Sequence, residues 1–199
     1  MIGGQAATLG FLGGSFDPPH MGHLILARDA LEQLGLDKVY LIPAAQSPLR
    51  DRPHAASYEH RVNLCRAVAS GRSWLDVLDI EGSLPLPSYT VNTARVLQTR
   101  FPGAELVWLL GADQWESLPK WKDYLLLARM MRFGVASRLG YQVSVFPPPC
   151  PEASLIHARN IEISSTELRE RLYCKLSIDH LAPVGVPEYI RSHSLYLHH

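Results

Sequence analysis

Short apolar runs alternate along this chain with longer segments whose apolar residues recur at helical spacing. The apolar runs cover residues 8–12, 39–42, 75–80, 106–110, 132–136 and 161–163. The helical segments cover residues 20–34, 58–69, 89–99, 167–172 and 187–193. Strands that are apolar throughout and joined by helices are typical of a parallel sheet covered on both faces. The pattern predicts an α/β fold, a Rossmann-like doubly wound parallel sheet with a small helical part at the C-terminal end.

Size and composition are those of one globular domain covering residues 1–199. Hydrophobic residues make up 47% of the 199 residues and charged residues 19%, which indicates a chain able to bury a core. The 19 basic residues balance the 19 acidic ones. A chain without net charge lacks the general attraction of a non-specific nucleic-acid binder. We therefore expect any anion to be bound by a local site, and no nucleic-acid partner.

Membrane and redox features are also informative. No apolar run approaches the ~18 residues of a membrane span, and the N-terminal segment lacks the basic start of a signal peptide. We expect a cytoplasmic protein without a membrane partner. The three cysteines, Cys65, Cys150 and Cys174, form no C-x-x-C pair. Free thiols are expected, with neither a disulfide framework nor a zinc knuckle.

The most informative segment is GGSFDPPHMGH at residues 13–23. Gly13 and Gly14 end a strand, so the backbone can turn sharply and approach a ligand, and its N–H groups can bind an anion. His20 and His23 lie three residues apart at the start of a helix, so both rings can face one spot. Gly22 between them leaves room for a phosphate. Such a site suits a polyphosphate in which charge develops during reaction.

Other interpretations of this segment are weaker. A single histidine near a helix start is commonly a surface or capping residue, and a histidine pair can bind metal, but no third ligand lies at zinc spacing. The segment matches neither the Walker loop nor the dinucleotide fingerprint G-x-G-x-x-G. The sequence therefore supports neither an ordinary NTPase nor a hydride-transfer enzyme.

A second phosphate-binding pattern, ISSTELR, covers residues 163–169. Its hydroxyl groups and free N–H groups at a helix start can bind an anion. Arg169 lies one turn beyond Thr166, so its guanidinium can reach the same phosphate. The alternative is an ordinary capped helix, with Ser164 or Ser165 as the cap. With the N-terminal segment, the pattern predicts a phosphate-binding C-terminal segment over about residues 161–199.

Together, GSFDPPHMGH (14–23) and ISSTELR (163–169) resemble the two signatures of the H-x-G-H nucleotidyltransferase superfamily. Three further segments are similar to the bacterial type of nicotinate mononucleotide adenylyltransferase within it. They are SYTVNT (88–93), GAD (111–113) and LPKW (118–121). The resemblance extends from about residue 8 to residue 196.

This resemblance implies a reaction in NAD biosynthesis. The 5′-phosphate of nicotinate mononucleotide attacks the α-phosphate of ATP in line, pyrophosphate leaves and deamido-NAD forms. No covalent intermediate is expected, and catalysis is by positioning and charge stabilisation. Mg²⁺ is the implied cofactor. It would bridge phosphate oxygens without side-chain ligands from the protein.

The resemblance also assigns residues. His20 and His23 are the implied catalytic residues, contacting the ATP phosphates and stabilising the transition state. The implied ATP-binding residues are Gly13, Gly14, Ser15, Phe16, His20, His23, Asp113, Ser165, Thr166 and Arg169. The implied mononucleotide-binding residues are Thr90, Val91, Trp121, Lys122 and Arg50. Trp121 would stack on the pyridine ring, with Trp108 and Trp115 as nearby competitors, and amides near Thr90 and Val91 would receive the carboxylate.

Two alternatives remain open. The acceptor could be nicotinamide mononucleotide, phosphopantetheine or a cytidylyl acceptor. The chain could also be a nucleotide-binding module without catalysis, because the loop 43–50 lacks the Pro-His-Lys-like run usual in the family and carries Arg50 in place of the lysine. The sequence leaves the oligomeric state open, a homo-oligomer included.

Overall fold

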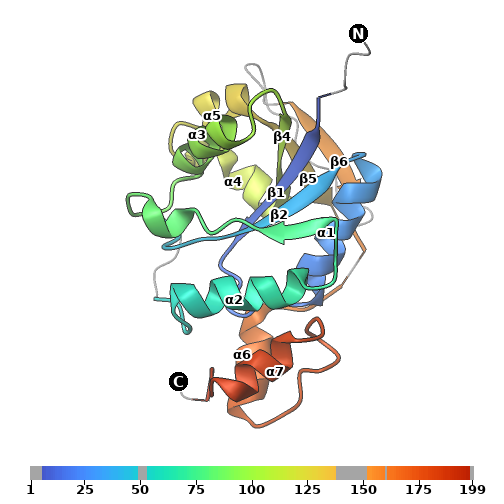
Figure 1. Cartoon of the computed structure of the whole chain (residues 1–199), viewed down its shortest axis with the longest axis vertical. Coiled ribbons are helices and arrows are strands. Elements are labelled where there is room, and N and C mark those ends of the chain that lie inside the picture. Colours follow the sequence, from blue (N-terminus) through green and yellow to red (C-terminus); the bar gives the residue numbers. More distant parts are fainter. Residues whose placement is uncertain (1–5, 49–52, 138–151, 160, 198–199) are drawn as a thin grey trace.

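A computed structural model describes residues 6–48, 53–137, 152–159 and 161–197. Its centre is a six-stranded sheet (Figure 1). The strands are β1 (Thr8–Gly14), β2 (Lys38–Pro43), β3 (Leu75–Val77), β4 (Glu105–Gly111), β5 (Arg132–Ser137) and β6 (Ala153–His157). All neighbours pair in parallel in the order β3-β2-β1-β4-β5-β6. This is the order of a doubly wound sheet, so the predicted fold class is confirmed.

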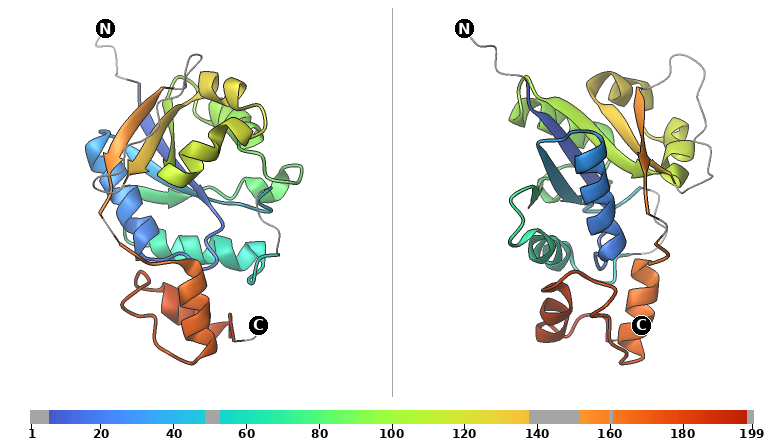
Figure 2. Two further views of the ribbon diagram at one scale, coloured as in Figure 1. Left: turned by 180° about the vertical axis from the view of Figure 1, so that it is seen from behind. Right: turned by 90° about the vertical axis from the view of Figure 1, so that its right-hand side faces the viewer.

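Helices cover both faces of the sheet (Figures 1 and 2). They are α1 (Met21–Gln33), α2 (Tyr58–Ala69), α3 (Thr90–Arg100), α4 (Ala112–Ser117), α5 (Tyr124–Met130), α6 (Ser165–Tyr173) and α7 (Val186–Ser192). Two 3₁₀ turns, η1 (Glu81–Ser83) and η2 (Leu118–Lys120), precede α3 and α5. The C-terminal helices α6 and α7 lie beyond α2 at one end of the molecule. None of the helices in the described ranges is long and apolar enough to cross a membrane.

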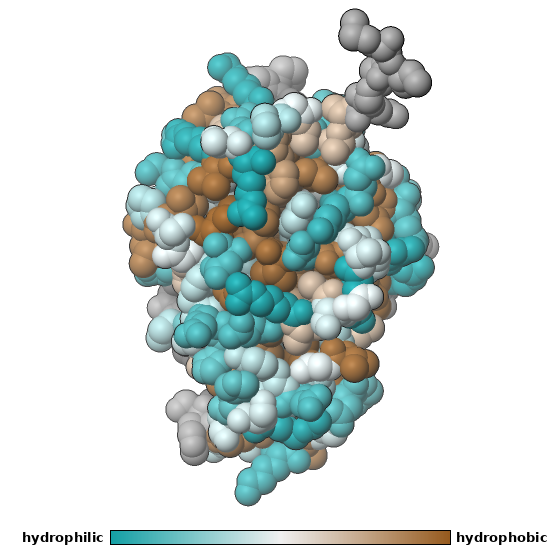
Figure 3. All heavy atoms as spheres, viewed as in Figure 1, coloured by the Kyte–Doolittle hydropathy of each residue, from teal (hydrophilic) through white to brown (hydrophobic). Residues whose placement is uncertain are grey.

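Each face of the sheet has its own hydrophobic core. Phe11 and Leu12 are neighbours in β1, yet they belong to different clusters, because successive side chains of a strand point to opposite faces. Leu12 packs with residues of α1, α2, α6 and α7. Phe11 packs with residues of α3, α4 and α5. On the surface seen in Figure 3, hydrophobic residues appear in patches interrupted by hydrophilic side chains.

Some expected elements differ from the observed ones. The expected strand 161–163 is absent, because residues 161, 162 and 163 form no strand in the structure. The sixth strand is instead β6, an edge strand in which Ile156 is the one fully buried side chain, so its apolar pattern is weak. The expected strand 75–80 pairs only as far as Val77, although Leu78 and Ile80 remain in the core. The short helices α4 and α5 were not predicted.

Free thiols were expected at all three cysteines. Cys65 is a buried free thiol in α2, and Cys174 is an exposed free thiol after α6. Cys150 lies outside the described residues.

The topology places the functional segments. The connections from β1 and β4 lead to opposite faces of the sheet, since α1 packs on one face and α4 on the other. In open α/β sheets a ligand crevice forms at this switch point, outside the carboxyl ends of the strands. Gly14 ends β1 and Gly111 ends β4. Both glycine-containing motifs found in the sequence therefore lie at this crevice.

Candidate active site

Two cavities lie at the carboxyl ends of the central strands. The first, of about 350 Å³, is bordered by Gly13, Gly14, Thr90, Trp121 and Lys122 among others. The second, of about 660 Å³, is bordered by residues that include His20, His23, Gly111 and Asp113. Gln114 borders both. The two cavities therefore lie side by side around one residue of α4, as two substrates that react with each other require.

The histidine pair lies at the start of α1. His20 is the N-cap residue and His23 the third residue of the helix. Their rings stack, with centroids 3.8 Å apart and planes 30° apart. The backbone N–H of His20 donates to Nδ1 of His23 over 3.1 Å. The neutral His23 ring therefore carries its proton on Nε2, where it can donate to a ligand.

Burial controls the charge of these rings. It lowers the pKa of His20 to about 4. It also lowers the pKa of His23 well below its usual value, and the charge of a protonated His20 would lower it further. Both rings are neutral at pH 7 when no ligand is bound. A triphosphate placed against the pair would favour protonation of His20, because a nearby negative charge stabilises the cation, while Nδ1 of His23 already accepts from the His20 amide.

Small and aromatic neighbours fix the ring positions. A Cβ on Gly22 would lie 3.0 Å from Nδ1 of His20, so the space at this glycine is occupied by the His20 ring and not left for a phosphate. Phe16, which has a left-handed backbone with φ of 47°, is buried. Its ring meets the edge of His23 at a centroid distance of 4.9 Å. Phe16 can therefore support His23 with its side chain and offer a ligand only its backbone.

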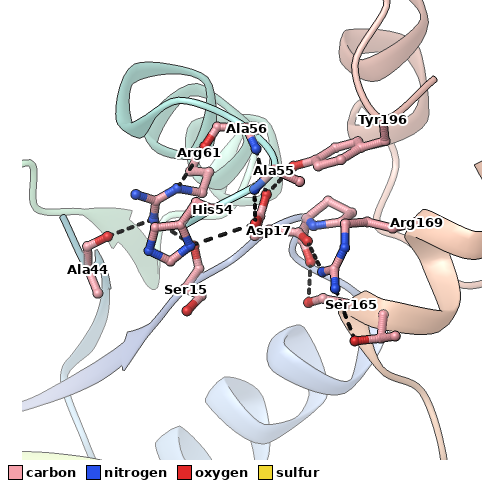
Figure 4. A network of polar contacts seen from close by, with 12 residues as sticks. Ser15, Asp17, Ala44, His54, Ala55, Ala56, Arg61, Ser165, Arg169 and Tyr196 are labelled. Carbon is pink, nitrogen blue, oxygen red and sulfur yellow. Dashed lines mark hydrogen bonds and ion pairs between the residues drawn. The ribbon is translucent and has the colours of Figure 1, made fainter. Parts of the chain in front are cut away.

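The two sequence signatures meet in space, although about 145 positions separate them (Figure 4). Oγ of Ser165 donates to the carbonyl of Pro18 over 2.8 Å. Nη1 of Arg169 donates to the carbonyl of Asp17 over 2.7 Å, and Nη2 donates to Oγ1 of Thr166 over 3.1 Å. The cap of α6 is Ser164, whose Oγ accepts from the Glu167 amide. Ser165 is thus available to join the helix to the β1–α1 loop.

A buried arginine that the sequence analysis missed joins this loop to the next one. Arg61 in α2 is 1% exposed. Its Nη1 donates to the carbonyls of Ser15 and Ala44 over 2.8 and 2.7 Å. Its other nitrogens donate to the carbonyls of Ala45 and Ala56, each over 3.3 Å. The sequence held one signal for this role: Arg61 lies on the apolar face of the helix predicted over residues 58–69.

The tryptophans that border the first cavity are Trp108 in β4 and Trp121, the residue after η2. Trp121 borders the cavity, and its buried Nε1 has no acceptor among the residues that the structure describes. Trp108 is 4% exposed and lies under Gly13, where a Cβ would come within 2.4 Å of its ring. Trp115 packs against Phe133 in the core. Of the three tryptophans considered, Trp121 is the one whose ring is partly exposed at the cavity.

The other residues expected here fall into different positions. The Lys122 ammonium lies 4.4 Å from the centroid of the Tyr89 ring. Thr90 borders the cavity as the first residue of α3. Val91 is 1% exposed, so its side chain belongs to the core and only its backbone amide can serve a ligand. Arg50 falls outside the described residues.

Two polar side chains at the cavities were not singled out from the sequence. Glu81 is buried beside the first cavity, and its carboxylate accepts from Oγ1 of Thr93 over 2.8 Å and from the Ala45 amide over 3.3 Å. Gln114 accepts from the Gly111 amide over 3.4 Å. Asp113 is exposed at the second cavity. Local sequence shows no reason to choose Glu81 or Gln114 over other polar residues, since only folding brings them to the cavities.

This geometry defines a nucleotidyltransferase-like site, and comparison with known proteins agrees. A family model described as cytidylyltransferase-like matches residues 11–171. The chain belongs to this family.

Similar proteins with more specific names indicate one type of enzyme within this family. The chain is 38% identical over 192 residues to a "probable nicotinate-nucleotide adenylyltransferase" of Methylacidiphilum infernorum, covering 95% of this chain and 92% of the relative. It is 39% identical over 189 residues to a protein of the same name from Opitutus terrae, with 94% and 97% covered. The fold matches a solved Plasmodium falciparum nicotinic acid mononucleotide adenylyltransferase in complex with NaAD. That match has a TM-score of 0.76 at 19% identity and covers 96% of this chain and 97% of the other.

Proposed function

We propose that this protein is an adenylyltransferase that joins ATP and nicotinate mononucleotide, giving deamido-NAD and pyrophosphate in NAD biosynthesis. The observation that carries the proposal is the meeting of the two phosphate signatures beside two adjacent cavities. One cavity holds the histidine pair and the other holds Trp121 with Lys122. The names of the relatives support the same substrates.

ATP fits the second cavity. Its triphosphate would lie between the histidine pair and the clamp formed by Ser165, Thr166 and Arg169. Gly13, Gly14 and Ser15 border the adjoining first cavity, and amides from Gly13 to Phe16 would reach the phosphates where the two cavities meet, because a strand end with two glycines exposes N–H groups. Asp113 lies at the same cavity and would bind the ribose, since a carboxylate accepts from hydroxyl groups.

Nicotinate mononucleotide fits the first cavity. Trp121 would stack on its pyridine ring. The amides of Thr90 and Val91 lie at the start of α3, where the helix dipole favours a carboxylate. Lys122 and Lys120 both border this cavity and add positive charge. A carboxamide would gain less from these groups, which favours the acid over the amide as substrate.

The reaction then needs positioning and charge stabilisation. The acceptor phosphate would attack the α-phosphorus of ATP in line, and the bond to the pyrophosphate would break. His23 donates from Nε2 toward phosphate oxygens, and His20 lies stacked on it. Both rings are neutral at rest, and His20 can gain a proton as the negative triphosphate binds, whereas Nδ1 of His23 already accepts from the His20 amide. Arg169 would stabilise the leaving pyrophosphate through its guanidinium.

Magnesium is part of this proposal. Across the ranges that the structure describes, no group of three His, Cys, Asp or Glu side chains could hold a metal ion. The donors at the phosphate site are N–H and O–H groups, which fit phosphate oxygens. Mg²⁺ would therefore be held by the phosphates of ATP, in line with its preference for retained waters. When bound, it would neutralise part of the triphosphate charge.

The test is pyrophosphate release from ATP and Mg²⁺ with either pyridine mononucleotide. We expect release with both substrates present and a higher kcat/KM for the acid than for the amide. Trp121→Ala should raise KM for the mononucleotide more than KM for ATP. Absence of pyrophosphate with both acceptors would refute the proposal, and a preference for the amide would refute its substrate.

We also propose that residues 1–199 act as one domain in the cytoplasm. The support for one domain is that α6 and α7 share a core with α1 and α2. Fluorescence microscopy of a tagged chain would test the location. A single cooperative unfolding transition would support the single domain.

A further inference from the structure

The carboxylate of Asp17 is fully buried and accepts from residues of two distant segments (Figure 4). The amides of Ala55 and Ala56 donate to it over 2.8 and 3.0 Å. The Tyr196 hydroxyl donates to its Oδ1 over 3.0 Å, and the His54 ring lies 3.6 Å from its Oδ2. Burial alone would raise the pKa of Asp17, but these hydrogen bonds outweigh it and hold the pKa at about 2. Asp17 is therefore an ionised carboxylate that three donors and an imidazole keep in one place.

The backbone around Asp17 is bound to the C-terminal part of the chain as well. Arg169 and Ser165 donate to the carbonyls of Asp17 and Pro18. Three residues further, the amide of Met21 donates to the carbonyl of Leu181 over 2.8 Å. Residues 165–196 thus contact the β1–α1 loop and the first residue of α1 through four hydrogen bonds. The Tyr196 contact is the one of these four that acts on a charged side chain of the loop.

The position of this loop decides the geometry of the phosphate site. The loop connects Gly14 to His20, so a shift of Asp17 moves both histidines relative to Arg169. Tyr196 is 7% exposed, and burial raises the pKa of its phenol, which stays a proton donor. A hydrogen bond to a charged group in a buried site is stronger than one between neutral groups. A small misplacement of catalytic groups is costly in rate.

We propose that Tyr196 is a positioning residue, whose hydroxyl holds the histidine-bearing loop in register with the Arg169 clamp through the carboxylate of Asp17. The proposal rests on the adenylyl-transfer function proposed above. It makes Tyr196, which lies 179 residues from Asp17, part of the machinery that positions the groups around the triphosphate.

Tyr196→Phe tests this proposal, because it removes the hydroxyl and leaves the ring in place. We expect kcat/KM for ATP to fall about tenfold, the effect of losing one charge-assisted hydrogen bond. KM for the mononucleotide should change less than about twofold, since the two histidines carried by this loop border the second cavity and not the first. The affinity for ATP in calorimetry should fall in parallel.

Tyr189→Phe is the matched control. The Tyr189 hydroxyl contacts Asn63 and His60, each over 3.1 Å, and so joins the same C-terminal part to α2 without touching the loop. Both variants should lose thermal stability, but Tyr189→Phe should keep the kcat/KM for ATP of the unchanged protein. The proposal is overturned if Tyr196→Phe lowers stability alone, or if both variants lower kcat/KM for ATP equally.

The same experiment separates this proposal from the proposed function. If the unchanged protein releases no pyrophosphate with either pyridine mononucleotide, the proposed function fails. The positioning role is then judged by calorimetry with ATP. A weaker ATP affinity in Tyr196→Phe than in Tyr189→Phe supports it, and equal affinities overturn it.

Discussion

Replacing Arg61 by methionine should destabilise the protein through the loops that this arginine joins. The guanidinium is buried, and its two shortest hydrogen bonds go to the carbonyls of Ser15 and Ala44. Methionine can fill the volume of the side-chain stem, but it offers no donor. Leaving a buried carbonyl without its partner costs about 1–3 kcal/mol. Part of this cost is offset because a charged group no longer has to be buried. We expect the free energy of unfolding to fall by about 2–4 kcal/mol.

Urea unfolding at pH 7 measures this change, with Arg61→Lys as the comparison. Lysine keeps the positive charge, but its single ammonium group cannot span the two loops as the guanidinium does. The free energy of unfolding of Arg61→Lys should therefore lie between those of the unchanged protein and Arg61→Met. Because Ser15 and Ala44 border the first cavity, KM for the mononucleotide should rise in both variants. A change of less than about 0.5 kcal/mol in Arg61→Met, the range of an ordinary surface substitution, would refute the reasoning.

Three further predictions follow from the site. His23→Ala should lower kcat about a hundredfold, as loss of a transition-state donor does, with an unchanged circular dichroism spectrum; a rate near that of the unchanged protein would contradict the role. Gly13→Ala should lower the free energy of unfolding by about 1–3 kcal/mol, because the new Cβ would lie 2.4 Å from the ring of Trp108. Denaturant unfolding measures this loss. KM for the mononucleotide should rise as well, because Gly13 and Trp108 both border the first cavity. The ligand-free protein should lose stability as the pH falls from about 6.5 to about 4, because the unfolded chain protonates His20 near its usual pKa while the folded chain does so only near 4. The free energy of unfolding from urea titrations should be lower at pH 5 than at pH 7 by about 2 kcal/mol from this residue, and His20→Asn should reduce the difference; an equal pH dependence in both proteins would count against the neutral ring. The carboxylate of Asp17 acts in a separate window, since its stabilising effect is lost only as the pH falls from about 4 toward 2.

Much of the fold was readable in the sequence because helix and strand periodicity are local. The apolar runs at 8–12, 39–42 and 106–110 became β1, β2 and β4, and these strands are buried on both faces. The pattern was wrong at residues 161–163 because three apolar-rich residues do not specify pairing. It missed β6 because an edge strand needs few buried side chains. The order of the strands and the meeting of their carboxyl ends were consequences of packing.

The candidate phosphate site also combines residues that a local sequence pattern reveals with residues that only tertiary packing brings into place. His20 with His23, and Ser165 with Arg169, each come from one short segment, so a pattern of a few residues suffices to find them. Arg61, Tyr196 and Glu81 act on groups far away in the sequence. Their roles depend on which segments the two cores bring into contact.

The residues proposed to bind phosphate could thus be found in the linear sequence, because a helix start and the glycine-rich segment before it form a candidate site within a short stretch of chain. The residues that hold those segments together could not. A hydrogen bond between Tyr196 and Asp17 joins two residues 179 positions apart, and its geometry exists only after the sheet, α2 and the C-terminal helices have packed. Local pattern therefore encoded the chemistry of each half of the site, and tertiary packing decided how the halves are placed against each other.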